Sequence, residues 1–195
     1  PDQKFVFAAD LGLDKILAYQ LDSETAKLTP AEQPFVRTIP GAGPRHLTFH
    51  PDGKQLYVIN ELKNSITEFD YNPESGMLIE GQTISTLPED FSGTSYCADL
   101  KFTPDGRFLY GTNRGHDSIA AYQVDDQGKL TLLEIEPSLG KGPQNLAVTA
   151  DGKYLICANM PGNNVVVFKI DDKTGKLSPA GDPVEIPSPS CIMIR

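Results

Sequence analysis

The sequence predicts an all-β protein, a β-propeller of four-stranded antiparallel blades, with about four of an expected seven blades present in this chain. One turn sequence recurs at intervals of about 50 residues, a spacing typical of repeat architectures. Its four copies are Pro1-Asp2-Gln3, Pro51-Asp52-Gly53, Pro104-Asp105-Gly106 and Ala150-Asp151-Gly152. The chain also lacks 3.6-residue apolar periodicity, and its 17 Gly and 16 Pro leave little room for helices.

Each repeat is predicted to begin with a β-hairpin centred on this turn. An Asp-Gly pair between two apolar runs favours a hairpin, because glycine supplies the positive φ that a tight turn between twisted strands requires. The runs that follow the turns span residues 5–9, 56–59, 108–111 and 154–158. We expect these runs to be second strands, with the first repeat lacking the strand before its turn.

A polar corner and a second turn complete the predicted blade. Each second strand ends in Asp or Asn, and we expect these side chains to form Asx-type turns with nearby backbone. The corner residues are Asp10, Asn60, Asn113 and Asn159. Third strands are expected at 16–21, 65–71, 118–124 and 164–170, and glycine turns at Gly76, Gly128 and Gly175 lead into fourth strands. Four antiparallel strands per repeat correspond to one propeller blade.

The repeats divide the chain at about 1–40, 41–92, 93–139 and 140–186, with a closing strand at 187–195. A propeller closes with about 4–8 blades, and this sequence begins without an initiator methionine. We therefore expect a single propeller domain that is truncated at its N-terminus. Its expected partner is the remaining set of N-terminal blades of the same propeller. A β-sandwich is the alternative, but it does not explain why four turns recur with aligned polar corners.

The composition argues against several function classes. The net charge is −9, with 26 acidic and 17 basic residues and no run rich in Lys or Arg, which argues against nucleic acid as a partner. No apolar stretch approaches the ~18 residues of a membrane span, and three cysteines without paired spacing are typical of reduced thiols in a cytoplasmic protein. We expect no metal and no cofactor, because no His, Asp or Glu cluster has ligand spacing.

One face of the predicted propeller gathers residues that differ between repeats. Strand direction alternates within a blade, so the loop before the first strand and the loop between the second and third strands lie on the same face. Arg45 and His46 occupy the first kind of position, and Glu61, Lys63 and Arg114 occupy the second. The equivalent positions in other repeats hold Leu11, Ala98, Gln144 and Met160. A purely structural position tends to repeat its chemistry, so this variation predicts a functional site on a repeated scaffold.

Several motifs, in this order and spacing, resemble the lactonase family of seven-bladed β-propellers. They are Asp10-Leu11-Gly12-Leu13-Asp14-Lys15, Gly43-Pro44-Arg45-His46, Asn60-Glu61, Pro104-Asp105-Gly106-Arg107-Phe108, Asn113-Arg114-Gly115-His116-Asp117 and Pro187-Ser188-Pro189. The family includes the propeller type of 6-phosphogluconolactonase and a fungal carboxymuconate cyclase. The resemblance covers essentially the whole chain and implies that it is the C-terminal half, or slightly more, of such a propeller.

The resemblance implies hydrolysis of a small anionic sugar-acid lactone, 6-phosphogluconolactone to 6-phosphogluconate, a reaction of the pentose phosphate pathway. It implies a site formed by Arg45, Glu61 and Arg114, together with a histidine that would precede Pro1. Gln144 departs from the family, which commonly has arginine at this position. If that arginine holds the anionic end of the substrate, Gln144 weakens or changes specificity.

The expected mechanism uses a carboxylate and two guanidinium groups. Glu61 is the predicted base that orients or deprotonates water, while Arg45 and Arg114 bind the substrate anion and stabilise the oxyanion. His46 is a further catalytic candidate that relays a proton, and Gln144 and Lys63 complete the predicted substrate-binding set.

Three alternatives stay open at this point. The two arginines and the glutamate also fit an ion-pair network that only ties blades together. The same arginine pair also suits a cycloisomerase acting on a carboxymuconate. A non-catalytic propeller that binds ligands or proteins is the third, because a fold alone is no warrant for chemistry.

Overall fold

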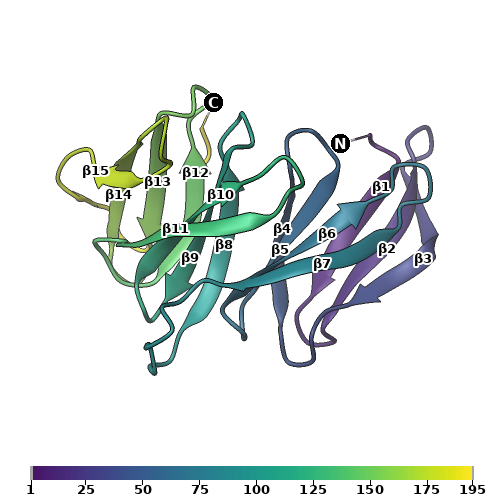
Figure 1. The fold of residues 1–195 in the computed structure, drawn as a ribbon, viewed down its shortest axis with the longest axis horizontal. Coiled ribbons are helices and arrows are strands. Elements are labelled where there is room, and N and C mark those ends of the chain that lie inside the picture. Colours follow the sequence, from purple (N-terminus) through teal and green to yellow (C-terminus); the bar gives the residue numbers. More distant parts are fainter. Residues whose placement is uncertain (1, 195) are drawn as a thin grey trace.

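The computed structural model describes residues 2–194 as four antiparallel sheets that follow one another side by side along the chain (Figure 1). The first sheet contains β1 (Phe5–Asp10), β2 (Lys15–Asp22) and β3 (Lys27–Arg37). The second contains β4 (Pro44–Phe49), β5 (Gln55–Asn60), β6 (Ser65–Tyr71) and β7 (Leu78–Ser85). The third contains β8 (Tyr96–Phe102), β9 (Phe108–Arg114), β10 (Ser118–Val124) and β11 (Leu130–Pro137). The fourth contains β12 (Pro143–Val148), β13 (Tyr154–Asn159), β14 (Asn164–Ile170), β15 (Leu177–Pro179) and β16 (Val184–Glu185).

The predicted all-β architecture is confirmed, because each sheet has the sequential strand order of a propeller blade. Neighbouring strands pair in chain order, except that β16 joins β14 beside β15. The first strands of the second, third and fourth sheets, β4, β8 and β12, contact one another in that order. These three inner strands, together with the ends of β5 and β9, carry the candidate site described below.

The recurring turns have the backbone conformation that the sequence predicts. Gly53, Gly106 and Gly152 have φ values of 78°, 77° and 69°. Gln3 has a φ of 59° at the corresponding position of the first turn, a conformation that costs a side chain more than it costs glycine. Pro1, which begins that predicted turn, lies outside the described residues.

The core lies between the sheets, so the strands of a middle blade are buried on both faces. Along β5, Leu56 and Val58 contribute to the cluster shared with the first sheet, and Tyr57 and Ile59 to the cluster shared with the third. All four side chains have no exposed surface. Successive strand residues point to opposite faces, and this alternation lets one strand stabilise two interfaces.

Side chains on the outer strands join each blade to the next. Gln33 accepts the backbone N–H of Leu78 at 2.8 Å and donates to its carbonyl at 3.2 Å. Gln82 binds Leu130 in the same way, at 2.7 and 2.9 Å. In the next pair Glu134 accepts the N–H of Leu177 at 2.6 Å, but a carboxylate has no N–H to donate to the carbonyl. The amide therefore makes two bonds where the carboxylate makes one.

The corner residues differ from the sequence prediction in three blades. Asp10 forms the expected Asx-type turn, because its carboxylate accepts the N–H of Leu13 at 3.0 Å. The prediction was wrong for Asn60, Asn113 and Asn159, which are at most 1% exposed. Their amides donate to the third strand of the same blade or to the linker that precedes that blade, with partners Ser65 and Thr67, Ser118 and Thr86, and Ser138. Burial removes solvent, so the amide satisfies groups that a local turn would leave unpaired.

Of the predicted closing strand at 187–195, residues 187–194 do not form a strand, and Arg195 lies outside the described residues. The segment nevertheless lies along β12, where the N–H of Ile192 donates to Asn145 Oδ1 at 2.8 Å. In the preceding pair of inner strands, the N–H of Leu146 donates to Asp99 Oδ2 at 3.0 Å. The segment thus approaches β12 in the same way that β12 approaches β8.

Candidate active site

Each of the three inner strands contains a β-bulge at the same place. The pairing register shifts between Pro44 and His46 in β4, between Cys97 and Leu100 in β8, and between Pro143 and Asn145 in β12. A bulge leaves one extra residue unpaired and re-aims nearby side chains, often beside an active site. The extra residues of β4 and β12 are Arg45 and Gln144, two of the residues that the sequence assigns to the site.

Arg45, Glu61 and Arg114, which we call the arginine cluster, meet across two blades. Arg45 Nη1 lies 2.8 Å from Glu61 Oε2, and Arg114 Nη2 lies 2.6 Å from Glu61 Oε1. The backbone carbonyls of β8 fix both arginines, since Arg45 Nε donates to Ala98 at 3.0 Å and Arg114 Nη2 to Cys97 at 3.0 Å. The three side chains are 16–24% exposed. One carboxylate between two guanidinium groups leaves a formal excess of one positive charge that solvent can reach.

The structure places one further predicted residue with this cluster and one away from it. Gln144 Oε1 accepts from Arg114 Nη1 at 3.3 Å. Lys63 is exposed and forms no hydrogen bond or ion pair with the cluster within residues 2–194; its charge lies near Asp14 instead. The backbone N–H groups of Gly43 and Gly41 lower the pKa of Asp14, with a smaller contribution from Lys63. The geometry therefore supports Gln144 as a neighbour of the arginines but does not bring Lys63 to them.

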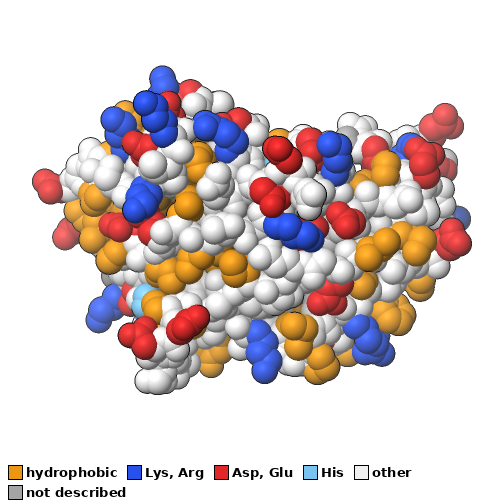
Figure 2. All heavy atoms as spheres, viewed as in Figure 1, with side chains coloured by type: hydrophobic (Ala, Val, Ile, Leu, Met, Phe, Trp, Pro, Cys, Tyr) orange, Lys and Arg blue, Asp and Glu red, His pale blue; other side chains and the backbone are white. Residues whose placement is uncertain are grey.

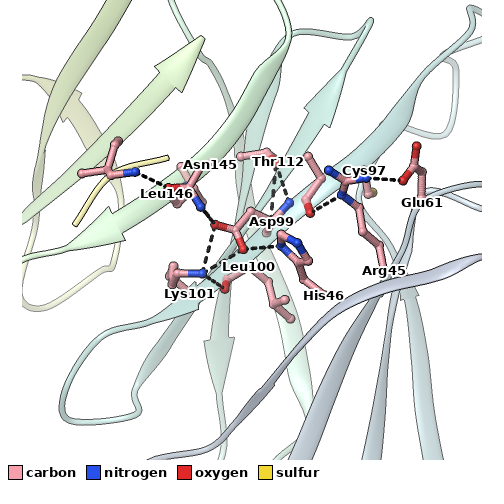
Figure 3. Close-up of polar contacts among 12 residues, drawn as sticks. Arg45, His46, Glu61, Cys97, Asp99, Leu100, Lys101, Thr112, Asn145 and Leu146 are labelled. Atoms are coloured by element: carbon pink, nitrogen blue, oxygen red, sulfur yellow. Dashed lines mark hydrogen bonds and ion pairs between the residues drawn. The ribbon is translucent and has the colours of Figure 1, made fainter. Parts of the chain in front are cut away.

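A second polar group, the aspartate cluster, surrounds Asp99 on β8 and includes His46, Lys101 and Asn145 (Figure 3). Asp99 Oδ1 lies 2.9 Å from His46 Nδ1 and 2.8 Å from Lys101 Nζ. Oδ2 accepts from Lys101 at 3.0 Å, from Asn145 Nδ2 at 2.6 Å and from the N–H of Leu146 at 3.0 Å. The Asp99 side chain has no exposed surface, whereas that of His46 is 45% exposed.

The charge state of Asp99 follows from these contacts. Complete burial alone would raise the pKa of its carboxyl group. The hydrogen bonds from His46 and Leu146 and the charge of Lys101 outweigh burial, so the pKa lies below its usual value of 3.8. Asp99 is therefore an ionised, fully hydrogen-bonded carboxylate at neutral pH.

Sequence reasoning did not identify Asp99, Lys101 or Asn145. One signal was present, because His46, Asp99 and Asn145 each follow the varied position that holds Arg45, Ala98 and Gln144.

His50 lies at the opposite face and differs from His46 in its contacts. Its Nδ1 lies 2.8 Å from Asp52 and its Nε2 lies 3.2 Å from the carbonyl of Gly106, so both ring nitrogens have protein partners.

Metal ligands and reactive thiols are two further features on which chemistry at a site can depend. This part of the chain contains no group of three or more His, Cys, Asp or Glu side chains arranged to hold a metal ion, and it contains no helix of the length and apolarity that a membrane crossing requires. Burial raises the pKa of Cys97 and Cys157 to about 12, so neither is a thiolate nucleophile at neutral pH. On the face drawn in Figure 2, acidic and basic side chains are interspersed rather than gathered by sign.

Comparisons with known proteins identify the family that this chain resembles in sequence and in structure. A family model described as "Lactonase, 7-bladed beta-propeller" matches residues 1–194. The 6-phosphogluconolactonase of Bacillus subtilis (strain 168) is 38% identical over 193 residues, which are 98% of this chain and 54% of that protein. The structure of a periplasmic gluconolactonase from Pseudomonas aeruginosa has a TM-score of 0.92 at 35% identity, covering 97% of this chain and 53% of that one. A structure of a Lactobacillus plantarum protein has a TM-score of 0.92 at 30% identity, covering 98% and 55%. The chain spans about half the length of the curated relatives it matches.

Proposed function

Because the chain belongs to the lactonase family of seven-bladed β-propellers, we propose that its inner strands form the face on which a sugar-acid lactone is hydrolysed. The observation that carries this proposal is the arginine cluster, in which side chains from two blades converge on one partly exposed point. The substrate class is supported by relatives named 6-phosphogluconolactonase and gluconolactonase. The proposed substrate is 6-phosphogluconolactone, with the unphosphorylated lactone as the competing candidate.

The two guanidinium groups suit both the ground state and the transition state of this reaction. A guanidinium fork matches carboxylate and phosphate oxygens, and it stabilises the oxyanion that develops when water attacks the carbonyl. Arg45 Nη2 makes no hydrogen bond to any residue in 2–194, so it is available to a substrate oxygen. The bonds to the β8 carbonyls hold the arginines in place before substrate arrives, which limits the ordering cost of binding.

The geometry supports a different role for Glu61 than the base that the sequence suggests. Each of its oxygens accepts one short hydrogen bond from a guanidinium group, so an attacking water would have to use the second lone pair of an oxygen that an arginine already holds. We assign Glu61 the role of holding the two arginines at a fixed separation. A base would affect turnover alone, whereas a holding residue affects turnover and substrate binding together.

The test is hydrolysis by the protein in the longest form that its gene encodes. Proton release from freshly prepared 6-phosphogluconolactone and from gluconolactone is followed above the spontaneous rate in buffer. The Arg114→Gln variant is expected to lose most of the acceleration, because it removes one of the two guanidinium groups. Arg107→Gln is the matched control, since Arg107 is exposed and pairs with Asp105 at one of the Asp-Gly turns.

The two lactones separate the candidate substrates. Faster hydrolysis of the phosphorylated lactone supports a site that binds phosphate despite Gln144, and a preference for gluconolactone transfers the proposal to the unphosphorylated substrate. The lactonase proposal fails if neither lactone is hydrolysed faster than in buffer, or if Arg107→Gln is as damaging as Arg114→Gln.

A further inference from the structure

The aspartate cluster has one member whose position a purely structural role does not explain. Asp99 already receives the charge of Lys101 and the N–H groups of Asn145 and Leu146. These contacts satisfy a buried carboxylate and join β8 to β12. His46 adds a bond from β4, yet its side chain is 45% exposed and its Nε2 has no hydrogen-bond partner within residues 2–194.

The contact with Asp99 determines which tautomer His46 adopts. An ionised carboxylate only accepts hydrogen bonds, so the 2.9 Å contact requires a proton on His46 Nδ1. In the neutral ring Nε2 then carries a lone pair, and a carboxylate in this place is known to hold a histidine in the form that accepts a proton. The contacts of Lys101, Asn145 and Leu146 in turn fix the orientation of the carboxylate.

His46 also lies next to the arginine cluster. Consecutive residues of a regular strand point to opposite faces, but the bulge at Arg45 lets both Arg45 and His46 reach β8. Arg45 donates to the carbonyl of Ala98, and His46 contacts the side chain of the next residue, Asp99. Figure 3 shows the two side chains lying beside each other on the inner strands, with the imidazole ring directed at Asp99.

We propose that Asp99 is a positioning residue that fixes His46 in the Nδ1–H tautomer, so that His46 Nε2 accepts the proton of the water attacking the lactone. The inference rests on the proposed lactonase function. It assigns the base to an imidazole with a free lone pair and leaves the anion and the oxyanion to the arginines.

The proposed step balances as follows. The water oxygen bonds to the carbonyl carbon while its proton passes to His46 Nε2, giving a tetrahedral oxyanion next to a guanidinium group. The oxyanion re-forms the carbonyl, the ring carbon–oxygen bond breaks, and the ring oxygen takes the proton from the imidazolium. The resulting carboxylic acid releases its proton to solvent, and His46 is neutral again.

The first test reads the tautomer directly and does not depend on activity. Long-range proton–nitrogen NMR spectra of the protein labelled with ¹⁵N-histidine, in the longest form that its gene encodes, distinguish Nδ1–H from Nε2–H rings. His46→Gln and His50→Gln assign the signals of these two histidines. We expect Nδ1–H for His46 in the wild type and a shift toward Nε2–H in Asp99→Asn. A wild-type His46 that is Nε2–H, or unaffected by Asp99→Asn, overturns the positioning by Asp99.

The second test separates turnover from binding. His46→Gln and Asp99→Asn are each expected to lower kcat by about 10²–10⁴-fold, the range for a general base, with little change in KM. His50→Gln is the control and is expected to keep full activity. If Asp99→Asn fails to fold, the wild-type spectrum and His46→Gln against His50→Gln still decide the question. If His46→Gln keeps the wild-type kcat, His46 is not the proton acceptor. If the wild type hydrolyses no lactone, the proposed function fails, and the tautomer of His46 then tests by itself whether Asp99 positions the ring.

Discussion

The bond between Gln82 and Leu130 allows a stability prediction in which one atom changes. Replacing Gln82 by Glu keeps the size and shape of the side chain and its acceptor for the N–H of Leu130. It removes the Nε2 donor, which lies 2.9 Å from the carbonyl oxygen of Leu130, and puts a carboxylate oxygen in its place. Leu130 is 3% exposed, so water does not readily replace the lost donor.

The expected cost follows from the cost of an unpaired buried acceptor. Leaving a buried acceptor without its donor costs about 1–3 kcal/mol, so Gln82→Glu is expected to lower the free energy of unfolding by about 2 kcal/mol. The buried carboxylate of Glu68, which accepts the backbone N–H of residue 82 at 3.0 Å, adds a like charge nearby. For a domain of this size the melting temperature is expected to fall by about 4–8 °C.

Thermal and urea unfolding at neutral pH measure this change, with Gln20→Glu as the control. Gln20 is exposed on β2 and its side chain makes no hydrogen bond within residues 2–194, so the control is expected to stay within about 0.5 kcal/mol of wild type. The new carboxyl group donates again when it is protonated, so the deficit is expected to shrink as the pH falls. A Gln82→Glu protein as stable as the control at neutral pH would refute the reasoning about the two-bond contact.

Two further predictions concern buried carboxylates. Lys129 Nζ lies 2.6 Å from Glu68, whose side chain has no exposed surface. Lys129→Met leaves this charge unpaired and is expected to cost about 3 kcal/mol in urea unfolding. Lys176→Met serves as the control and is expected to cost little, because Lys176 is exposed and forms no ion pair within residues 2–194. The pKa of Asp99 is lower in the folded protein than its usual 3.8, so the stability it contributes is present above that value and is lost as the pH falls through the folded pKa. Unfolding free energies at pH 7 and in acid are therefore expected to differ less in Asp99→Asn than in wild type, and an unchanged difference would contradict the assigned contacts.

The sequence predicts the strands well because the signals for them are local. The expected third strands 65–71, 118–124 and 164–170 coincide with β6, β10 and β14. Apolar alternation, a polar corner before the strand and a glycine turn after it determine such a strand within a few residues. The repeat comparison also singled out Arg45, Glu61 and Arg114, because each differs in chemistry from its counterparts in other blades. Gln144 was identified by its departure from the family pattern, and the structure brings all four residues together.

The features that the sequence did not predict depend on distant partners. His46 and Asp99 are 53 residues apart in the chain, and no spacing rule relates a residue of one inner strand to its neighbour in the next blade. The bulge at Arg45 has no residue signature, since it appears only when the register of β4 against β5 is known. The corner asparagines were assigned to local turns for the same reason, because their burial depends on side chains contributed by other segments.

The most direct test of the account is the kinetics of 6-phosphogluconolactone hydrolysis by wild type and Glu61→Gln, measured as proton release over a range of substrate concentrations. We predict that the wild type accelerates hydrolysis well above buffer, and that Glu61→Gln both raises KM and lowers kcat because neither arginine keeps its charged partner. A fall in kcat at constant KM would return the role of base to Glu61. A wild-type rate equal to that of buffer for both lactones would contradict the assignment of this face to lactone hydrolysis.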